Sequence, residues 1–184
     1  VAQSGCIGVG GDHITNDISV VMKIPLTRSE KLKIDHGSAL PENDEDSSIV
    51  LDDDPLKSGL EIDKELLNQI INARATEIFE QLKDRITKHD NLDTLGAGVF
   101  LTGGASKLKD IDKLAEDILG LPVSLARISS MSGASAPSEN PQLATAMGLI
   151  RYAQMIESDK SENENLVSKI GKKLGGIFGG GSVE

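Results

Sequence analysis

In the second half of the chain a strand, a glycine loop, a helix and another strand follow one another, and this order constrains the fold most. Residues 99–101 are apolar and form the first predicted strand, and residues 102–106 form a loop with two glycines. Gly120 and Pro122 end the helix that follows. Strands joined through a helix run parallel. The sequence therefore predicts an α/β fold in which residues 99–101 pair with residues 123–128.

Helices and a strand pair are also predicted upstream of this unit. Asp12 is expected to cap a helix that ends before Pro25, and Thr27 to Glu30 has the spacing of a capping box. That second helix ends at Gly37. Two short strands, 48–51 and 60–62, are expected to pair.

A long helix follows, and a last one comes after a loop of small and polar residues. Asp63 is expected to cap the long helix, whose apolar residues between 66 and 86 recur with a period near 3.6. Asn140 and Pro141 open the last helix, since proline is favoured in the first turn.

Composition excludes several classes of function. The net charge is -10 over 184 residues, which disfavours nucleic acid as a partner. Aromatic residues make up 2%, so the core must be aliphatic. Cys6 is the only cysteine and is expected to be a buried thiol, and the three histidines lack metal-ligand spacing. We therefore predict neither catalytic nor metal-ligating residues, and no apolar run approaches the ~20 residues that span a bilayer.

Two glycine pairs are candidates for contact with a ligand. Glycine lets the backbone approach a ligand closely, so residues 102–106 form a candidate nucleotide loop, although a tight strand-to-helix turn would need the same residues. Gly10 and Gly11 form a second pair before a helix. Glu30 and Lys33 share one helix face, where a carboxylate accepts from ribose hydroxyls and an ammonium donates. Alternatively, Glu30 serves the capping box and Lys33 is a surface lysine.

Four segments together resemble one family. Residues 9–18 and 29–39 are similar to signatures of FtsA, the actin homologue of the bacterial division ring. Residues 98–105 resemble the adenosine motif of the actin and DnaK-type superfamily, and residues 141–149 resemble the closing helix of the family. The resemblance covers nearly the whole chain in the order of the family.

The resemblance implies an α/β fold, an actin-like (ribonuclease H-like) ATPase lobe with an inserted α+β subdomain and a C-terminal amphipathic helix. Residues 1–24 and 92–156 would form the nucleotide-binding lobe, partial in this chain. Residues 25–91 would form the inserted upper subdomain. A flexible linker, 157–165, would lead to a membrane-targeting tail, 166–184.

The resemblance also implies ATP with Mg²⁺ as cofactor. The nucleotide would contact Gly10, Gly11, Glu30, Lys33, Gly103, Gly104 and Ala105. Two upstream phosphate motifs of the family are absent, and phosphoryl transfer depends on the metal and water that they position. Whether the complete protein is an ATPase stays open, and this chain is not expected to hydrolyse ATP alone.

The implied partners are the C-terminal peptide of the tubulin-like protein FtsZ, further copies of the protein in filaments, and anionic lipids. The peptide would bind residues 25–91, where Arg74 matches a position implicated in that contact. A solvated helix arginine is the alternative reading of Arg74.

The tail has the pattern of a basic amphipathic helix. Its apolar residues fall within an arc of roughly 120°, with three lysines opposite, and glycines weaken the helix in water. Burial in lipid and attraction of lysine to anionic headgroups offset the ordering cost. We expect peripheral attachment to the cytoplasmic face of the cell membrane. The candidate membrane residues are Leu166, Lys169, Ile170, Lys172, Lys173, Leu174, Ile177 and Phe178.

These features predict a membrane adaptor that ties the division ring to the cytoplasmic membrane. An ATPase or small-molecule kinase lobe of the same superfamily, or a pilus-assembly relative, would share the fold. The amphipathic tail favours the adaptor, because a soluble kinase has no use for it.

Overall fold

The computed structural model describes residues 4–41, 48–51, 60–88, 96–126 and 140–157. The chain divides into two units, Val1–Arg127 and Ile128–Glu184. The elements of the first unit are α1 (Gly11–Met22), α2 (Leu26–His36), β1 (Ser48–Leu51), β2 (Leu60–Asp63), α3 (Lys64–Thr87), β3 (Val99–Leu101), the 3-10 helix η2 (Gly104–Lys107), α4 (Ile111–Leu119) and β4 (Val123–Leu125).

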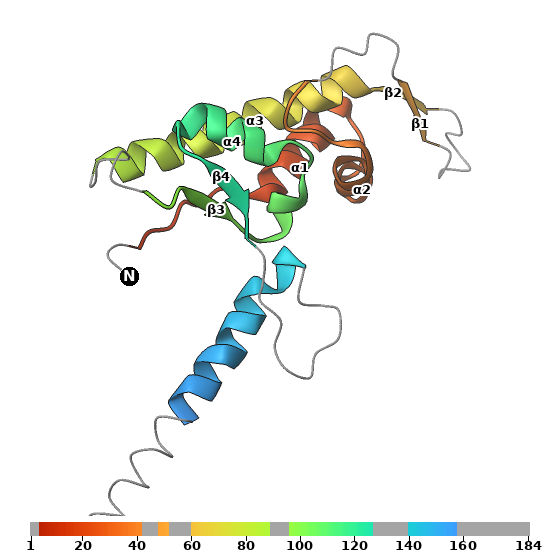
Figure 1. Ribbon diagram of the computed structural model, residues 1–184. Coiled ribbons are helices and arrows are strands. Elements are labelled where there is room, and N and C mark those ends of the chain that lie inside the picture. The colour runs from red at the N-terminus through yellow and green to blue at the C-terminus, as the bar shows by residue number, and fades with distance from the viewer. Residues whose placement is uncertain (1–3, 42–47, 52–59, 89–95, 127–139, 158–184) are drawn as a thin grey trace, which may run out of the picture. The chain divides into compact units, whose positions relative to one another are not determined.

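Helix α3 runs along the first unit and takes part in both of its cores (Figure 1). Its first half packs with α1, α2 and the β1–β2 pair, and its second half packs with α4 and the β3–β4 pair. Both cores are mostly aliphatic, as the composition predicts. The first core comprises Ile14, Ile18, Ile24, Leu32, Ile49, Ile62, Leu67 and Ile71, and the second comprises Ala39, Ala75, Phe79, Ile111, Leu114, Ala115 and Leu119.

Both predicted strand pairs are present. β1 and β2 are antiparallel, with Ile49 opposite Ile62. β3 and β4 are parallel, with Phe100 opposite Ser124. The second strand of the parallel pair ends at residue 125, earlier than predicted. The α/β unit read from the glycine loop is therefore confirmed.

The segment after α2 is fixed by polar groups from α3 and from the turn before α4. The Ser38 N–H donates to Asn68 Oδ1 at 2.9 Å, and Asn72 Nδ2 donates to the Ala39 carbonyl at 2.7 Å. The Ala39 N–H donates to the Lys109 carbonyl at 2.8 Å. Because buried backbone groups need partners, these bonds fix where α2 ends relative to α3 and α4.

Gly37 makes this close approach possible. A Cβ at this position would lie 2.5 Å from the Lys33 carbonyl oxygen and 2.6 Å from Ile71 Cδ1. The φ angle of Gly37 is -74°, which suits any residue, so the requirement for glycine is purely steric. The predicted helix end at Gly37 is thus correct, but lack of space explains it rather than left-handed backbone.

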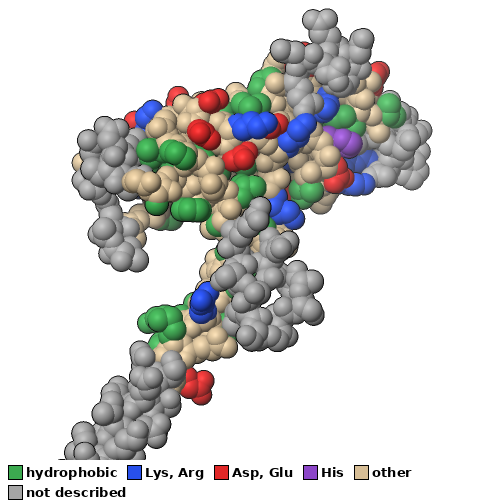
Figure 2. All heavy atoms as spheres, in the orientation of Figure 1, with side chains coloured by type: hydrophobic (Ala, Val, Ile, Leu, Met, Phe, Trp, Pro, Cys, Tyr) green, Lys and Arg blue, Asp and Glu red, His purple; other side chains and the backbone are tan. Residues whose placement is uncertain are grey.

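Acidic and basic side chains are interspersed with hydrophobic ones on the visible face of α3 and α4 (Figure 2). Lys83 joins the two helices, because its Nζ donates to the Ile118 carbonyl near the end of α4. That carbonyl has no partner within its own helix, so the lysine satisfies it.

Two predicted helix starts are wrong. Helix α2 begins at Leu26, with Pro25 as its N-cap and no side-chain cap, so Thr27 lies inside the helix and no capping box forms. Helix α1 begins at Gly11 rather than after Asp12, and its N-cap is Gly10. In contrast, Asp63 caps α3 as expected, accepting from the N–H groups of residues 65 and 66.

The prediction of a buried Cys6 is also wrong. The Cys6 side chain is exposed, and residues 4–9 belong to no strand. Arg85 Nη1 of α3 donates to the Cys6 carbonyl at 2.9 Å, so this segment lies beside α3. The apolar neighbours in sequence therefore do not bury the thiol, since no sheet pairing folds the segment into a core.

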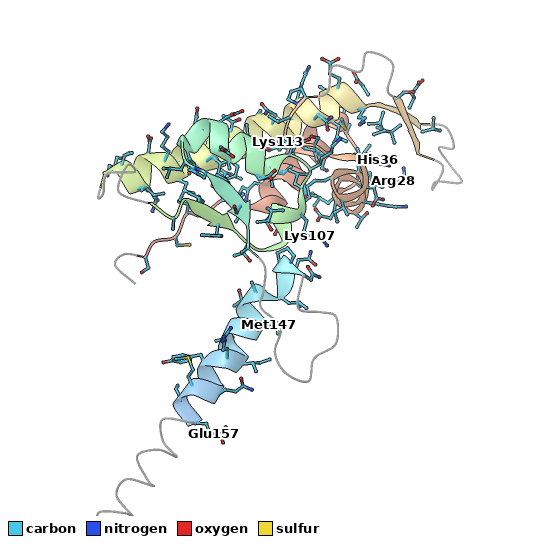
Figure 3. The ribbon with its side chains drawn as sticks, viewed as in Figure 1. Arg28, His36, Lys107, Lys113, Met147 and Glu157 are labelled. Atoms are coloured by element: carbon cyan, nitrogen blue, oxygen red, sulfur yellow. The ribbon has the colours of Figure 1, made fainter. Side chains whose placement is uncertain are left out.

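The described part of the second unit is helical. The 3-10 helix η4 (Pro141–Leu143) leads into a helix over residues 144–157, and Asn140 Oδ1 accepts from the Gln142 N–H, so the predicted start is correct. Figure 3 labels Met147 and Glu157 on this helix. Among the described helices, none combines the length and apolarity that a membrane crossing requires.

Gly37→Ala is expected to lower the free energy of unfolding by about 1–3 kcal/mol, because the added methyl group has no space beside Ile71. Gly5→Ala is the matched control, since a Cβ there meets nothing within 4 Å. Urea denaturation followed by far-UV circular dichroism measures both. Equal stability of the two variants would contradict the steric account of Gly37.

Candidate functional site

A cluster of polar groups joins the first turns of α1 to the middle of α2. Lys33 Nζ lies 2.6 Å from Glu30 Oε2, 2.8 Å from Thr15 Oγ1 and 3.2 Å from the Gly11 carbonyl oxygen. The Thr15 hydroxyl also donates a short hydrogen bond to Glu30 Oε2. The structure therefore brings the predicted residues Gly11, Glu30 and Lys33 together.

Gly11 lies between this cluster and the second glycine loop. A Cβ built on Gly11 would be 3.7 Å from Lys33 Nζ and 3.6 Å from Ala105 Cβ. Ala105 belongs to η2, more than ninety residues along the chain. Figure 3 shows the two elements that flank the first turn of α1, with Arg28 and His36 labelled on α2 and Lys107 on η2. The two glycine motifs thus meet, as the nucleotide hypothesis requires.

A cavity of about 160 Å³ opens where they meet. Most of its lining is apolar, from α1, α3, β3 and α4, and the glycines of the first pair form part of its wall. Ligand pockets usually measure about 300–1,000 Å³, so this cavity is too small for a whole nucleotide. The lining residues are Gly10, Gly11, Ile14, Ala75, Ile78, Phe79, Leu101, Thr102, Ala105, Ser106 and Ile111.

The second glycine loop does not lead directly into a long helix, although the sequence predicts that it does. Gly103 has a φ angle of +94°, which only glycine adopts readily, and its carbonyl accepts from Ser106 Oγ at 2.7 Å. Gly104 begins the short 3-10 helix η2, and α4 begins only at Ile111. Neither Gly103 nor Gly104 lines the cavity. Ala105 is therefore the residue of this motif with the clearest place beside Gly11.

Charge is balanced within the polar cluster. Burial raises the pKa of Glu30, but hydrogen bonds from Lys33 and Thr15 and the charge of Lys33 outweigh it, so the pKa lies below its usual value. The Lys33 side chain is 12% exposed and that of Glu30 is 44% exposed. Glu30 is thus an ionised group that remains accessible, whereas Lys33 is mostly enclosed.

Arg74 lies away from this cluster, on α3. Its Nε is 2.5 Å and its Nη2 3.1 Å from the two carboxylate oxygens of Asp17, and its Nη1 is 2.5 Å from Glu77 Oε2. These contacts raise the pKa of Arg74, the hydrogen bond to Asp17 most. The arginine is therefore not simply solvated: it ties α3 to α1, and Asp17 is on the helix that begins at the cavity.

The remaining predicted sites lie outside the described part of the chain or have no counterpart in it. All the candidate membrane residues, 166–178, lie outside the described residues. Among the residues that are described, no group of three or more His, Cys, Asp or Glu could hold a metal ion. Mg²⁺ stays an expectation from the resemblance.

The sequence did not predict a role for Thr15 or Asp17, although both make clear side-chain contacts. Both lie on α1, where threonine and aspartate look like ordinary surface residues of an amphipathic helix. Thr15 is buried, and it lies one turn after Gly11 on the face that meets α2. The one sequence signal was that Thr15 neighbours the apolar stripe through Ile14 and Ile18.

Comparison with known proteins identifies a family for this chain. The family model "Cell division protein FtsA" matches residues 1–148. The FtsA of Rhizobium meliloti is 30% identical over 161 residues, and that of Agrobacterium fabrum is 31% identical over 159 residues. These alignments cover 85% and 84% of this chain but 36% of each relative. The chain therefore spans well under half the length of these relatives.

Solved structures agree on the fold. MreB5 of Spiroplasma citri bound to ADP superposes with a TM-score of 0.63 at 18% identity, over 84% of this chain and 47% of that one. The same protein bound to AMPPNP gives 0.64 at 19% identity, over 85% and 47%. The predicted actin-like α/β fold is confirmed.

Asp17→Asn is expected to destabilise the chain by about 1–2 kcal/mol, because it removes the charge that neutralises a half-buried arginine side chain. Glu77→Gln is the matched control, since Glu77 meets the same arginine from a 48% exposed position and should cost under about 0.5 kcal/mol. Urea denaturation gives both values. A larger loss for Glu77→Gln would contradict the assignment of Asp17 as the main partner.

Proposed function

The chain belongs to the FtsA family of cell-division proteins, and we propose that it forms part of an actin-like, ATP-binding adaptor that tethers FtsZ to the cytoplasmic membrane. The match over residues 1–148 carries the proposal, because it spans both glycine motifs and the segment between them. A kinase or pilus-assembly role finds no comparable support.

The nucleotide part of the proposal rests on the first turn of α1. Glu30, Lys33 and Ala105 come to Gly11 from two distant segments, and Gly11 leaves the backbone accessible there. The similar MreB5 structures hold ADP and AMPPNP. An adenosine group would lie against Gly11 and Ala105 with its sugar near Glu30. Because the cavity is small, the phosphates and Mg²⁺ would be held by parts of the protein that this chain does not contain.

The partner part of the proposal rests on α3. The Arg74 side chain is 26% exposed, so it reaches solvent, where a carboxylate from the FtsZ C-terminal peptide would approach it. Glu77, the more exposed of its two partners, is the one that such a carboxylate would displace. Asp17 would keep the guanidinium in place meanwhile. Arginine binds carboxylates bidentately, which suits it to recognise an acidic peptide.

The membrane part of the proposal rests on the sequence of residues 166–178. One amphipathic helix of this length would bind lipid reversibly. Many such helices on one polymer would bind tightly, because each bound helix raises the effective concentration of the others. Self-association of the actin-like fold would thus strengthen membrane binding by a weak anchor.

Vesicle flotation with a labelled FtsZ C-terminal peptide tests the adaptor. The chain should carry the peptide to vesicles that contain anionic lipid, and the chain cut after residue 157 should bind the peptide but leave it in solution. Replacing Lys169, Lys172 and Lys173 with Gln should weaken vesicle binding by roughly a hundredfold, at about 1 kcal/mol for each lysine.

Arg74→Glu separates the partner from the lipid in the same assay. It should abolish recruitment of the peptide while vesicle binding by the chain itself stays unchanged, and Glu77→Gln should leave both intact. If Arg74→Glu recruits the peptide as the unmodified chain does, the proposed peptide site is wrong. If the chain cut after residue 157 floats with the vesicles, the proposed anchor is wrong.

A further inference from the structure

The ammonium of Lys33 has all of its donors engaged. A lysine side chain has three N–H groups, and three acceptors surround Nζ: the Gly11 carbonyl, Thr15 Oγ1 and Glu30 Oε2. The side chain is also only 12% exposed. Lys33 therefore has no donor left for a ligand in this arrangement, although the sequence suggested a direct contact with the nucleotide.

The two oxygens of Glu30 are not equivalent. Oε2 accepts from both the Lys33 ammonium and the Thr15 hydroxyl. Among the described residues, no hydrogen-bond donor meets Oε1. The Glu30 side chain is 44% exposed, so the carboxylate reaches solvent. One oxygen is thus held by the protein and the other is available.

Thr15 and Lys33 together determine which oxygen is held. The Thr15 hydroxyl has a single proton and two acceptors, Glu30 Oε2 and the Gly11 carbonyl at 3.2 Å, and Glu30 is the nearer of the two. The hydroxyl oxygen accepts from Lys33. Thr15 is 6% exposed and lies on α1, so its position is fixed by the packing of Ile14 and Ile18. The hydroxyl therefore orients a carboxylate on a different helix.

We propose that Thr15 is a positioning residue of the nucleotide site: with Lys33 it holds Glu30 Oε2, so that Oε1 accepts a hydrogen bond from a sugar hydroxyl of the nucleotide. This inference rests on the proposed nucleotide site. It gives Lys33 a supporting role and makes Glu30 the residue that contacts the sugar. Recognition of ribose then depends on a threonine that does not touch the ligand.

Thr15→Val and Thr15→Ser test the proposal, because valine keeps the branched shape and serine keeps the hydroxyl. Carbon-13 NMR titration of the Glu30 carboxyl measures its pKa without any ligand. The pKa should rise in Thr15→Val, which removes one of the groups that lower it, and should stay near the unmodified value in Thr15→Ser. Amide spectra of all variants verify that they are folded.

Ligand-observed NMR with ADP and 2′,3′-dideoxy-ADP measures the recognition of the sugar. The unmodified chain and Thr15→Ser should prefer ADP by roughly tenfold, the effect of one hydrogen bond to a charged group. Thr15→Val and Glu30→Gln should lose most of this preference. A preference for ADP that survives in Thr15→Val, or that Thr15→Ser fails to restore, would overturn the positioning role.

The two measurements separate the possible failures. If the pKa of Glu30 responds to Thr15 but the unmodified chain does not bind ADP, the proposed nucleotide site is wrong and the inference is overturned with it. If ADP binds with a preference for ribose but the pKa ignores Thr15, the nucleotide site stands and Thr15 has no positioning role.

Discussion

The ion pair between Lys33 and Glu30, closed by Thr15 and the Gly11 carbonyl, is the interaction on which the site depends. It holds the first turn of α1 against the middle of α2, two helices that a short turn at Pro25 connects. Because the ammonium is mostly enclosed and fully hydrogen-bonded, its desolvation is offset and the two helices have one well-defined relative position. Ala105 lies close to Gly11, so the second glycine motif adjoins the first.

Helix α3 links this site to the face proposed to bind the partner. Its first half packs on α1 and α2, its second half packs on α4, and Arg74 in between is bound to Asp17 of α1. Two polar residues of α1 thus face in different directions: Thr15 toward α2 and Asp17 toward α3. Helix α1 would therefore link a ligand at Gly11 to a peptide at Arg74, because it begins at Gly11 and carries Asp17.

The sequence predicted the pattern of elements well because local signals determine it. Asp63 and Asn140 cap helices as expected, and the parallel pair follows from a strand, a glycine loop and a helix. Long-range contacts decided what was missed. Glu30 fits a capping box on local grounds, but Thr15 and Lys33 engage its carboxylate instead, and Cys6 looks buried by its neighbours but no sheet covers it. Asp17, the main partner of Arg74, is fifty-seven residues away, beyond any local pattern.

We propose that the two glycine motifs form one face of a nucleotide site. Titration of the nitrogen-15-labelled chain with ATP, followed by amide chemical shifts, tests it most directly. The account predicts that the largest changes cluster at residues 10–15, 30–33 and 103–106 and spare β1 and β2. Changes scattered over the chain, or confined to only one of the two glycine motifs, would contradict it.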